Sequence, residues 1–177
     1  MHQKYAFQSM FQSGLTLVEL IVCMGVLAIL ANLALPTMAD VLAKWQRDRA
    51  TRALVDHLQL ARASAIKSTR NVVMCNSIDG VSCASTSQKD WTRGWLVFQD
   101  HNANKVFDGT DILVASAGPA DGISTLTSSN GVRSFVFMPS GLMASGMSTL
   151  VITPKRGTSM KIVVNRVGRF RLTEDPT

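Results

Sequence analysis

The sequence predicts an α+β protein in which one long N-terminal helix packs on an antiparallel β-sheet region. Residues 15–35 form an apolar run, and good helix formers continue from Pro36 to about Arg70. After Asn71 the chain changes to short β-type runs separated by Gly, Ser, Asn and Asp. A helix followed by consecutive strands is typical of the α+β class, and the residues from Pro36 onward are enough for one domain.

The first element is an apolar segment with a single charge. Residues 15–35 contain Glu19 as their only charged residue. As a helix rising about 1.5 Å per residue, this segment spans about 31 Å, the thickness of the hydrocarbon core of a bilayer. An ordinary secretory signal fits poorly, because the run is too long and no small-x-small cleavage site follows it. The pattern therefore predicts a membrane-spanning helix.

Glu19 is costly at membrane depth, and an intramembrane carboxylate is a functional hypothesis whose partner should be named. If the chain is cut between Gly14 and Leu15, the new α-amine has an unperturbed pKa of about 7.7 to 8.0 and is mostly cationic near neutral pH. The amine of one subunit could then neutralise Glu19 of a neighbouring subunit. We therefore expect Glu19 to set the register of subunits in an assembly.

The second half of the helix carries an apolar stripe and a basic face. The apolar residues recur mostly at steps of three or four: Val41, Trp45, Leu54, Leu58, Ala61 and Ala65. The basic residues lie mostly off that stripe: Lys44, Arg47, Arg49 and Arg52. We expect the stripe to pack on the sheet, and we interpret the basic residues as a solvated face.

The β region contains short runs from which we expect six to eight strands. In order, they are "VVMC", "GWLVFQ", "DILVAS", "STLT", "VRSFVFM", "STLVIT", "MKIVVNRV" and "GRFRL". These strands should form an antiparallel region that covers the C-terminal half of the helix.

Charge and cysteine content add two constraints. The net charge is +6, and a basic helix (36–71) and a basic tail (151–177) flank an acidic centre. Of the three cysteines, Cys23 lies in the apolar run. Cys75 and Cys83 either pair in a disulfide, if the domain lies outside the cytoplasm, or remain buried free thiols.

The stretch "DHNANKVFDGTD" is similar to a calcium loop in its oxygen ligands, which are Asp100, Asn102, Asn104, Asp108 and Asp111. Lys105 replaces the glycine of the sharp turn, and no glutamate stands at the twelfth position. A polar hairpin loop without metal is the better interpretation. The residues His57 and His101 belong to no catalytic motif, so neither an enzyme nor a cofactor is expected.

The tail offers a candidate nucleic-acid site. Its basic residues are Lys155, Arg156, Lys161, Arg166, Arg169 and Arg171. In a strand, Phe170 and Leu172 would turn inward while Arg169 and Arg171 point out, about 6.6 Å apart. Two outward guanidinium groups suit a phosphate backbone, and Gly168 would leave room for close approach. The alternative is a solvated or inter-subunit face.

The N-terminal stretch "SGLTLVELIV" resembles the class III signal of type IV pilins and type II secretion pseudopilins. The resemblance rests on Gly14 before the cut, the apolar Leu15, Glu19 at the fifth position, and Pro36 at the end of the membrane half. It implies cleavage by prepilin peptidase and N-methylation of Leu15. The implied organisation is a leader (1–14), a transmembrane half of the helix (15–35) and a periplasmic globular domain (36–177).

Four further segments, "LQLARASAIKSTRNVVMC", "WTRGWLVFQDHNANKVFDGTDILV", "FMPSG" and "IVVNRVGRFRL", look in this order like the GspH/FimT family of minor pilins and pseudopilins. This resemblance implies a type IV pilin-like fold. "GRFR" matches the Gly-Arg-x-Arg of the FimT branch, which is associated with DNA binding in natural transformation.

We therefore expect a minor pilin of a Gram-negative type IV pilus, held in the inner membrane before assembly, that helps to capture DNA. Its expected partners are other pilins or pseudopilins, prepilin peptidase and DNA. The alternative is a structural type II secretion pseudopilin of the H type. A membrane-tethered calcium-binding or catalytic module is a third and weaker alternative.

Overall fold

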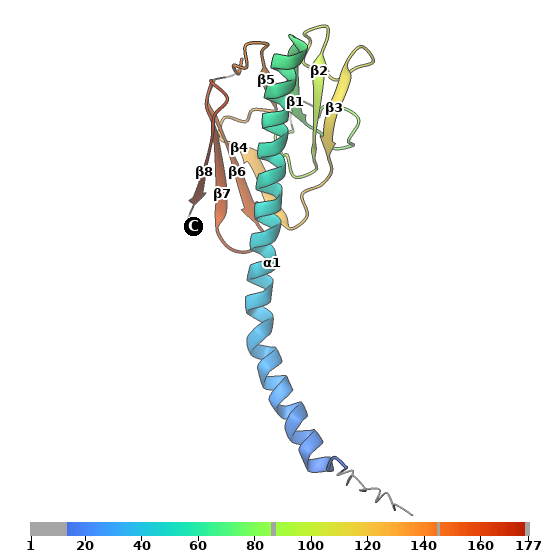
Figure 1. Ribbon diagram of the computed structural model, residues 1–177, viewed down its shortest axis with the longest axis vertical. Helices are drawn as coiled ribbons and strands as arrows, with labels where there is room; N and C mark the ends of the chain where they lie inside the picture. Colours follow the sequence, from blue (N-terminus) through green and yellow to red (C-terminus); the bar gives the residue numbers. More distant parts are fainter. Residues whose placement is uncertain (1–13, 86–87, 145, 176–177) are drawn as a thin grey trace, which may run out of the picture. The chain divides into compact units, whose positions relative to one another are not determined.

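The computed structural model describes residues 14–85, 88–144 and 146–175, without the side chains of 32–37. The described residues form one helix, α1 (Leu17–Ser68), followed by eight strands (Figure 1). The strands are β1 (Asn71–Asn76), β2 (Trp95–Asp100), β3 (Ile112–Ala117), β4 (Ile123–Ser128), β5 (Ser134–Phe137), β6 (Ser148–Pro154), β7 (Ser159–Val164) and β8 (Phe170–Asp175). The α+β prediction is confirmed.

The chain divides into two compact units between Ala39 and Asp40. In the first unit, α1 begins after Thr16, whose Oγ1 accepts a hydrogen bond from the backbone N–H of Glu19 at 3.3 Å. This contact joins the N-cap residue to the third helical residue, a common way to satisfy a free N–H at a helix start.

The membrane prediction concerns this first unit. Within the residues described, no helix is both long enough and apolar enough to cross a membrane. The expected segment 15–35 lies partly outside that description, because the side chains of 32–37 are not described. The expected leader falls on residues 1–13, which also lie outside it, and on Gly14.

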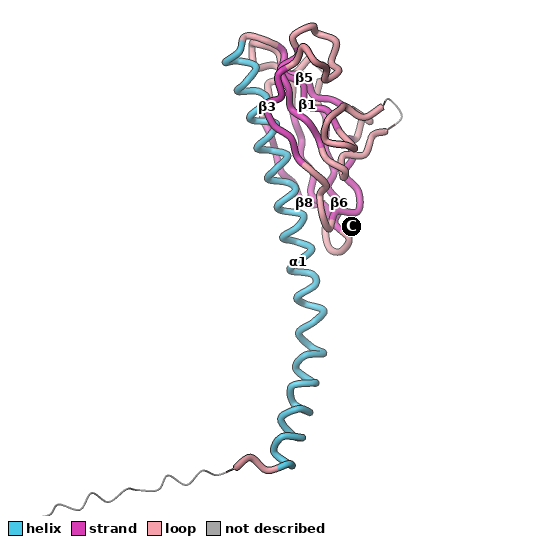
Figure 2. The backbone as a smooth tube through the Cα atoms, turned by 90° about the vertical axis from the view of Figure 1, so that its right-hand side faces the viewer, coloured by secondary structure: helices cyan, strands magenta, loops and turns pink. Residues whose placement is uncertain are grey.

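The second unit contains two antiparallel sheets that lie against one side of α1 (Figure 2). The strand order is β3-β2-β1-β5 in one sheet and β4-β6-β7-β8 in the other. Leu54, Leu58, Ala61 and Ala65 of α1 are fully buried in a core to which both sheets contribute. This part of the expected stripe is therefore correct.

The N-terminal part of the expected stripe is wrong. Val41 and Trp45 are 45% and 69% exposed, whereas Ala43 and Arg47 are buried. The buried face of α1 thus reaches Leu54 through positions 43, 47 and 50. This face includes the arginine at position 47, because the long stem of an arginine can lie along a buried surface.

The outer face of the first sheet carries a second apolar cluster, formed by Val73, Cys75, Leu96, Phe98 and Val136. Cys83 and Phe107 pack against it from loops. Because both faces of β1 and β2 are covered, these strands are buried almost continuously rather than at alternate positions.

Candidate nucleic-acid interface

The β7–β8 hairpin carries the arginines that the sequence predicted as a DNA site. Val163 faces Arg171 and Val164 faces Phe170 in the antiparallel register. Asn165 closes the turn: its N–H donates to the carbonyl of Arg169, and its Oδ1 accepts from the N–H of Arg169 at 2.8 Å. The side chains that this hairpin exposes include Arg166, Arg169 and Arg171.

Strand β8 forms the edge of its sheet, which limits how far its inward-facing side chains are buried. Phe170 is half-buried and packs against the main core, as alternation predicted. Leu172 lies opposite the buried Ile162, yet it is 51% exposed. Leu172 therefore lies on the inward face as expected but remains half exposed, because an edge strand has a neighbour on one side only and its core-facing side chains are incompletely covered.

Lys161 lies on the outer face of β7, where it is already paired. Its Nζ lies 2.7 Å from Oδ2 of Asp175, and both side chains are about 40% exposed. An exposed pair of this kind is weak and is screened by salt. Lys161 therefore offers less free charge to a phosphate than the turn arginines, none of which forms an ion pair within the described parts of the chain.

Lys155 and Arg156 lie apart from the other basic residues of the tail. They occupy the exposed turn between β6 and β7, at the opposite end of β7 from Arg166 and Arg169 (Figure 1). A strand of this length spans about 20 Å. The structure therefore brings Arg166, Arg169 and Arg171 together at one end of the hairpin and places Lys155 and Arg156 at the other.

Gly168 does not have the role that the sequence suggested. It is buried, with a φ of 70°, and a Cβ added to it would lie 2.8 Å from Cδ of Arg62. The space that the glycine leaves is filled by an arginine of α1 and does not open toward a ligand. The expectation that Gly168 leaves room for a phosphate is therefore wrong.

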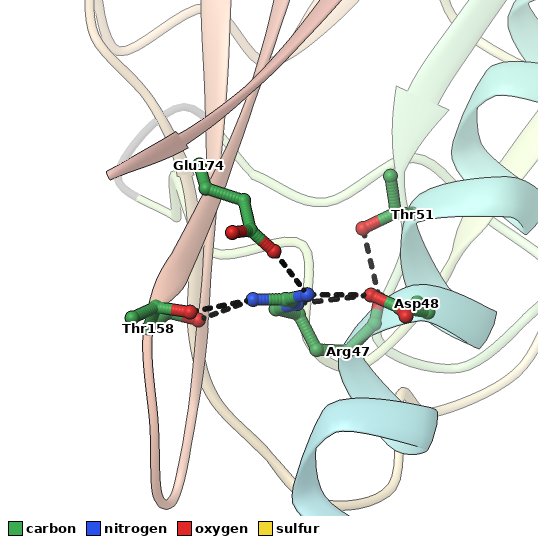
Figure 3. Close-up of polar contacts among 5 residues, drawn as sticks. All are labelled: Arg47, Asp48, Thr51, Thr158 and Glu174. Atoms are coloured by element: carbon green, nitrogen blue, oxygen red, sulfur yellow. Dashed lines mark hydrogen bonds and ion pairs between the residues drawn. The ribbon is translucent and has the colours of Figure 1, made fainter. Parts of the chain in front are cut away.

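Arg47 is a buried cation that sequence reasoning missed (Figure 3). Its Nη1 donates to the carbonyl and to Oγ1 of Thr158 at 3.0 and 2.7 Å, and its Nη2 donates to Asp48 and Glu174, each at 2.9 Å. Burial alone would lower the pKa of Arg47, but the hydrogen bonds and charges of the two carboxylates outweigh it and raise the pKa. Arg47 thus ties α1 to the β6–β7 turn and to β8.

The polar loop after β2 satisfies its own carboxylates. Asp100 accepts from the N–H groups of Asn104 and Lys105, and Asp108 accepts from the amides of Asn102 and Asn104. Hydrogen bonds to Asp108, first that of the Thr110 hydroxyl, lower the pKa of its carboxyl group. Within the described ranges, no three His, Cys, Asp or Glu side chains group as metal ligands.

Cys75 and Cys83 form a disulfide, which was one of the two alternatives left open by the sequence. Cys75 lies in β1 and is buried, and the bond fastens the following loop over the outer face of the first sheet. Cys23 has a free thiol. Gly14, Leu15 and Glu19, the expected processing residues, are all exposed.

The sequence is similar to a known protein family and to a known pilin-like protein. The model of the family described as "Type II transport protein GspH" matches residues 50–168. The pilin-like protein PilA1 of Thermus thermophilus is 28% identical over 168 residues, which cover 92% of this chain and 99% of that protein.

Two solved structures are similar in fold. The type IV minor pilin FimU of Pseudomonas aeruginosa is 17% identical, with a TM-score of 0.55, over 71% of this chain and 91% of that one. The minor pseudopilin EpsH of the Vibrio cholerae type 2 secretion system is 17% identical, with a TM-score of 0.51, over 73% and 97%. The expected type IV pilin-like fold is therefore confirmed.

Proposed function

The chain belongs to the family of the type II transport protein GspH, and from this membership we propose that it is a minor pilin of a type IV pilus that takes part in pilus biogenesis and DNA capture. As a type IV minor pilin or pseudopilin, it is a structural component of a filament and not an enzyme. Its partners include other pilins or pseudopilins.

The observation that carries the DNA role is the group of three exposed arginines at one end of the β7–β8 hairpin. Arg166 and Arg169 lie in and beside the turn, and Arg171 follows on the outer face of β8. Guanidinium groups bind phosphate in a forked geometry. Among the residues that the structure describes, no base-reading motif accompanies them, so the contacts should be to the backbone and independent of sequence.

A salt-dependent titration of duplex DNA with the full chain in non-ionic detergent tests this role. With three phosphates neutralised, log K should fall with log salt at a slope of about −3, and the affinity should be roughly micromolar or weaker. Arg169→Gln with Arg171→Gln should abolish most of the binding and lower transformation in cells.

The β6–β7 turn provides a matched control. Lys155→Gln with Arg156→Gln removes the same charge from the other end of β7 and should change the affinity little. Equal losses in both double variants would indicate non-specific attraction to net charge. If the Arg169 and Arg171 variant binds as well as the unchanged chain, the DNA role is wrong.

The second candidate is a type II secretion pseudopilin of the H type with a purely structural role. The similarity to EpsH favours it, because EpsH is a minor pseudopilin of such a system. Under this alternative the chain does not bind DNA, and its deletion impairs protein secretion instead of transformation.

The proposal includes the route into the filament. Prepilin peptidase would remove the leader 1–14, and residues 15–35 would hold the protein in the inner membrane before assembly. The Cys75–Cys83 disulfide supports a periplasmic position for the domain from Pro36 onward, since disulfides persist in oxidising compartments.

A further inference from the structure

Arg62 of α1 lies between two turns that are distant in sequence. Its Nε donates to the carbonyl of Gly141 at 3.1 Å, and its Nη1 donates to the carbonyl of Gly168 at 3.4 Å. Gly141 belongs to the turn after β5, and Gly168 belongs to the β7–β8 turn. One half-buried guanidinium group thus bridges both turns to the helix.

Both turns are built to approach the helix closely. Gly141 and Gly168 have φ values of 76° and 70°, which a residue with a Cβ rarely adopts. A Cβ at Gly168 would lie 2.8 and 2.9 Å from Cδ and Nε of Arg62, and a Cβ at Gly141 would lie 2.9 Å from Cδ1 of Ile66. The positive φ favours glycine at both positions, and an added side chain would also force Arg62 or Ile66 to move.

The two turns are also joined to each other. The backbone N–H of Met143 donates to the carbonyl of Arg166 at 2.8 Å. Hydrogen bonds therefore connect Arg62 to both turns and the turns to each other. These contacts lie at the end of the hairpin where Arg166 and Arg169 are exposed.

In the part of the chain that the structure describes, Arg62 holds the two turns without an ion pair that would neutralise its charge. The hydrogen-bond acceptors that it uses are two neutral carbonyls, and it forms no ion pair within the described residues. A carboxylate acceptor in place of the two carbonyls would instead neutralise the guanidinium charge next to the arginines that bind phosphate. Carbonyl acceptors leave the charge of Arg62 uncompensated.

We propose that Arg62 is the positioning residue of the DNA-binding turn: it docks the turn against α1 so that Arg166 and Arg169 are presented to the phosphate backbone in a fixed arrangement. This inference rests on the proposed function. Arg62 acts through the turn and does not itself contact DNA.

Arg62→Lys is the informative variant, because it keeps the net charge but a lysine cannot reproduce the planar fork that reaches both carbonyls. We expect DNA affinity at fixed salt to fall roughly three- to tenfold, since the turn must then be ordered on binding. In the Arg166→Gln, Arg169→Gln background, the same substitution should have almost no further effect, because the two side chains that Arg62 positions are then absent and coupled residues are not additive.

A second measurement does not depend on DNA. Hydrogen exchange in the full chain should become faster in the segments 138–143 and 165–169 of the Arg62→Lys variant, while exchange in β6 stays unchanged. A change spread over the whole second unit would indicate a general loss of stability and would overturn the positioning role.

The remaining outcomes are separable. Unchanged exchange in both turns, or unchanged affinity, overturns the proposal. An equal loss of affinity in the double-arginine background means that Arg62 contacts DNA directly, which also overturns it. If the double-arginine variant binds like the unchanged chain, the proposed function is wrong, and the exchange result alone decides whether Arg62 holds the two turns.

Discussion

Nη2 of Arg47 lies 2.9 Å from Oε1 of Glu174, and this contact joins the start of the buried face of α1 to the last strand of the chain. The two side chains differ in environment: that of Arg47 is 3% exposed and that of Glu174 is 58% exposed. The arginine also donates twice to Thr158. The hydrogen bonds to Thr158 and Asp48 should therefore matter more for stability than the exposed end of the ion pair.

The first prediction follows from this difference. Arg47→Ala should lower the free energy of unfolding by roughly 2 to 4 kcal/mol, because it removes several charge-assisted hydrogen bonds and leaves their acceptors unpaired. Glu174→Gln should cost less than about 1 kcal/mol, since its carboxylate is largely solvated. Urea denaturation measures both. Equal losses would show that the ion pair, and not the bonds to Thr158 and Asp48, dominates.

The disulfide gives the second prediction. Closing a loop between residues separated by 8 positions should stabilise the domain by about 2 to 3 kcal/mol through the entropy of the unfolded chain. Reduction of the unchanged chain should lower the denaturation midpoint accordingly. The Cys83→Ser variant, which leaves the buried Cys75 in place, should be insensitive to reductant. Two free thiols in protein taken from the periplasm would contradict the pairing.

The strands were predictable to a useful degree from local pattern. All eight runs read as β-type overlap observed strands, because each combines β-branched or aromatic residues with flanking turn residues. Their division into two sheets was not predictable, since pairing such as β1 with β5 depends on contacts between distant segments. Local pattern therefore fixes the identity of these strands but not their partners.

The site was predictable only in part, for a related reason. The exposed arginines of the hairpin follow from the alternation of a strand. The burial of Arg47 and the fit of Gly168 against Arg62, 106 residues away, depend on tertiary packing. The sequence did contain a signal for the burial of Arg47. Positions 43, 47, 50 and 54 lie on one helical face, so an arginine at this spacing faces the core.

The third prediction concerns pH. Trp95 donates its indole N–H to Nδ1 of His57 at 2.7 Å, which requires that nitrogen to be unprotonated. Burial lowers the pKa of His57, and the charge of Asp56 opposes this only in part. Because the folded-state pKa lies below the unfolded value of about 6.5, the unfolded state binds the proton more readily. His57 therefore contributes its full stability above pH 6.5, and the contribution falls as the pH drops through the folded-state pKa.

Melting temperatures at pH 5.5 and 7.5 measure this effect. The unchanged chain should melt at a lower temperature at pH 5.5. His57→Gln should reduce the difference, because glutamine keeps an acceptor for Trp95 but does not titrate. The same pH dependence in both proteins would assign the effect to other groups.

Processing gives the fourth prediction. Gly14 precedes the apolar segment that begins at Leu15, and the resemblance to pilin signals places the cut between them. Mass spectrometry of the mature protein should find Leu15 at the N-terminus, carrying an N-methyl group. Retention of the leader, or a cut beyond Leu35, would be incompatible with assembly as a pilin.

The last prediction separates two roles of Glu19. Its backbone N–H donates to Oγ1 of Thr16, which caps the helix start, whereas its carboxylate is expected to meet the α-amine of a neighbouring subunit. Glu19→Gln removes the charge and keeps the backbone bond, and Thr16→Ala removes the capping oxygen and keeps the charge. If Glu19 lies at membrane depth, as proposed, a cationic partner would offset the cost of its carboxylate, so the charge should be what assembly requires. Glu19→Gln should therefore leave membrane insertion and cleavage intact but strongly reduce incorporation into filaments, measured by immunoblotting of sheared filaments against the membrane fraction.

Thr16→Ala should reduce incorporation much less, since an N-cap contributes about 1 kcal/mol. Normal incorporation of Glu19→Gln together with a defect in Thr16→Ala would assign Glu19 to the helix start and remove it from subunit registration.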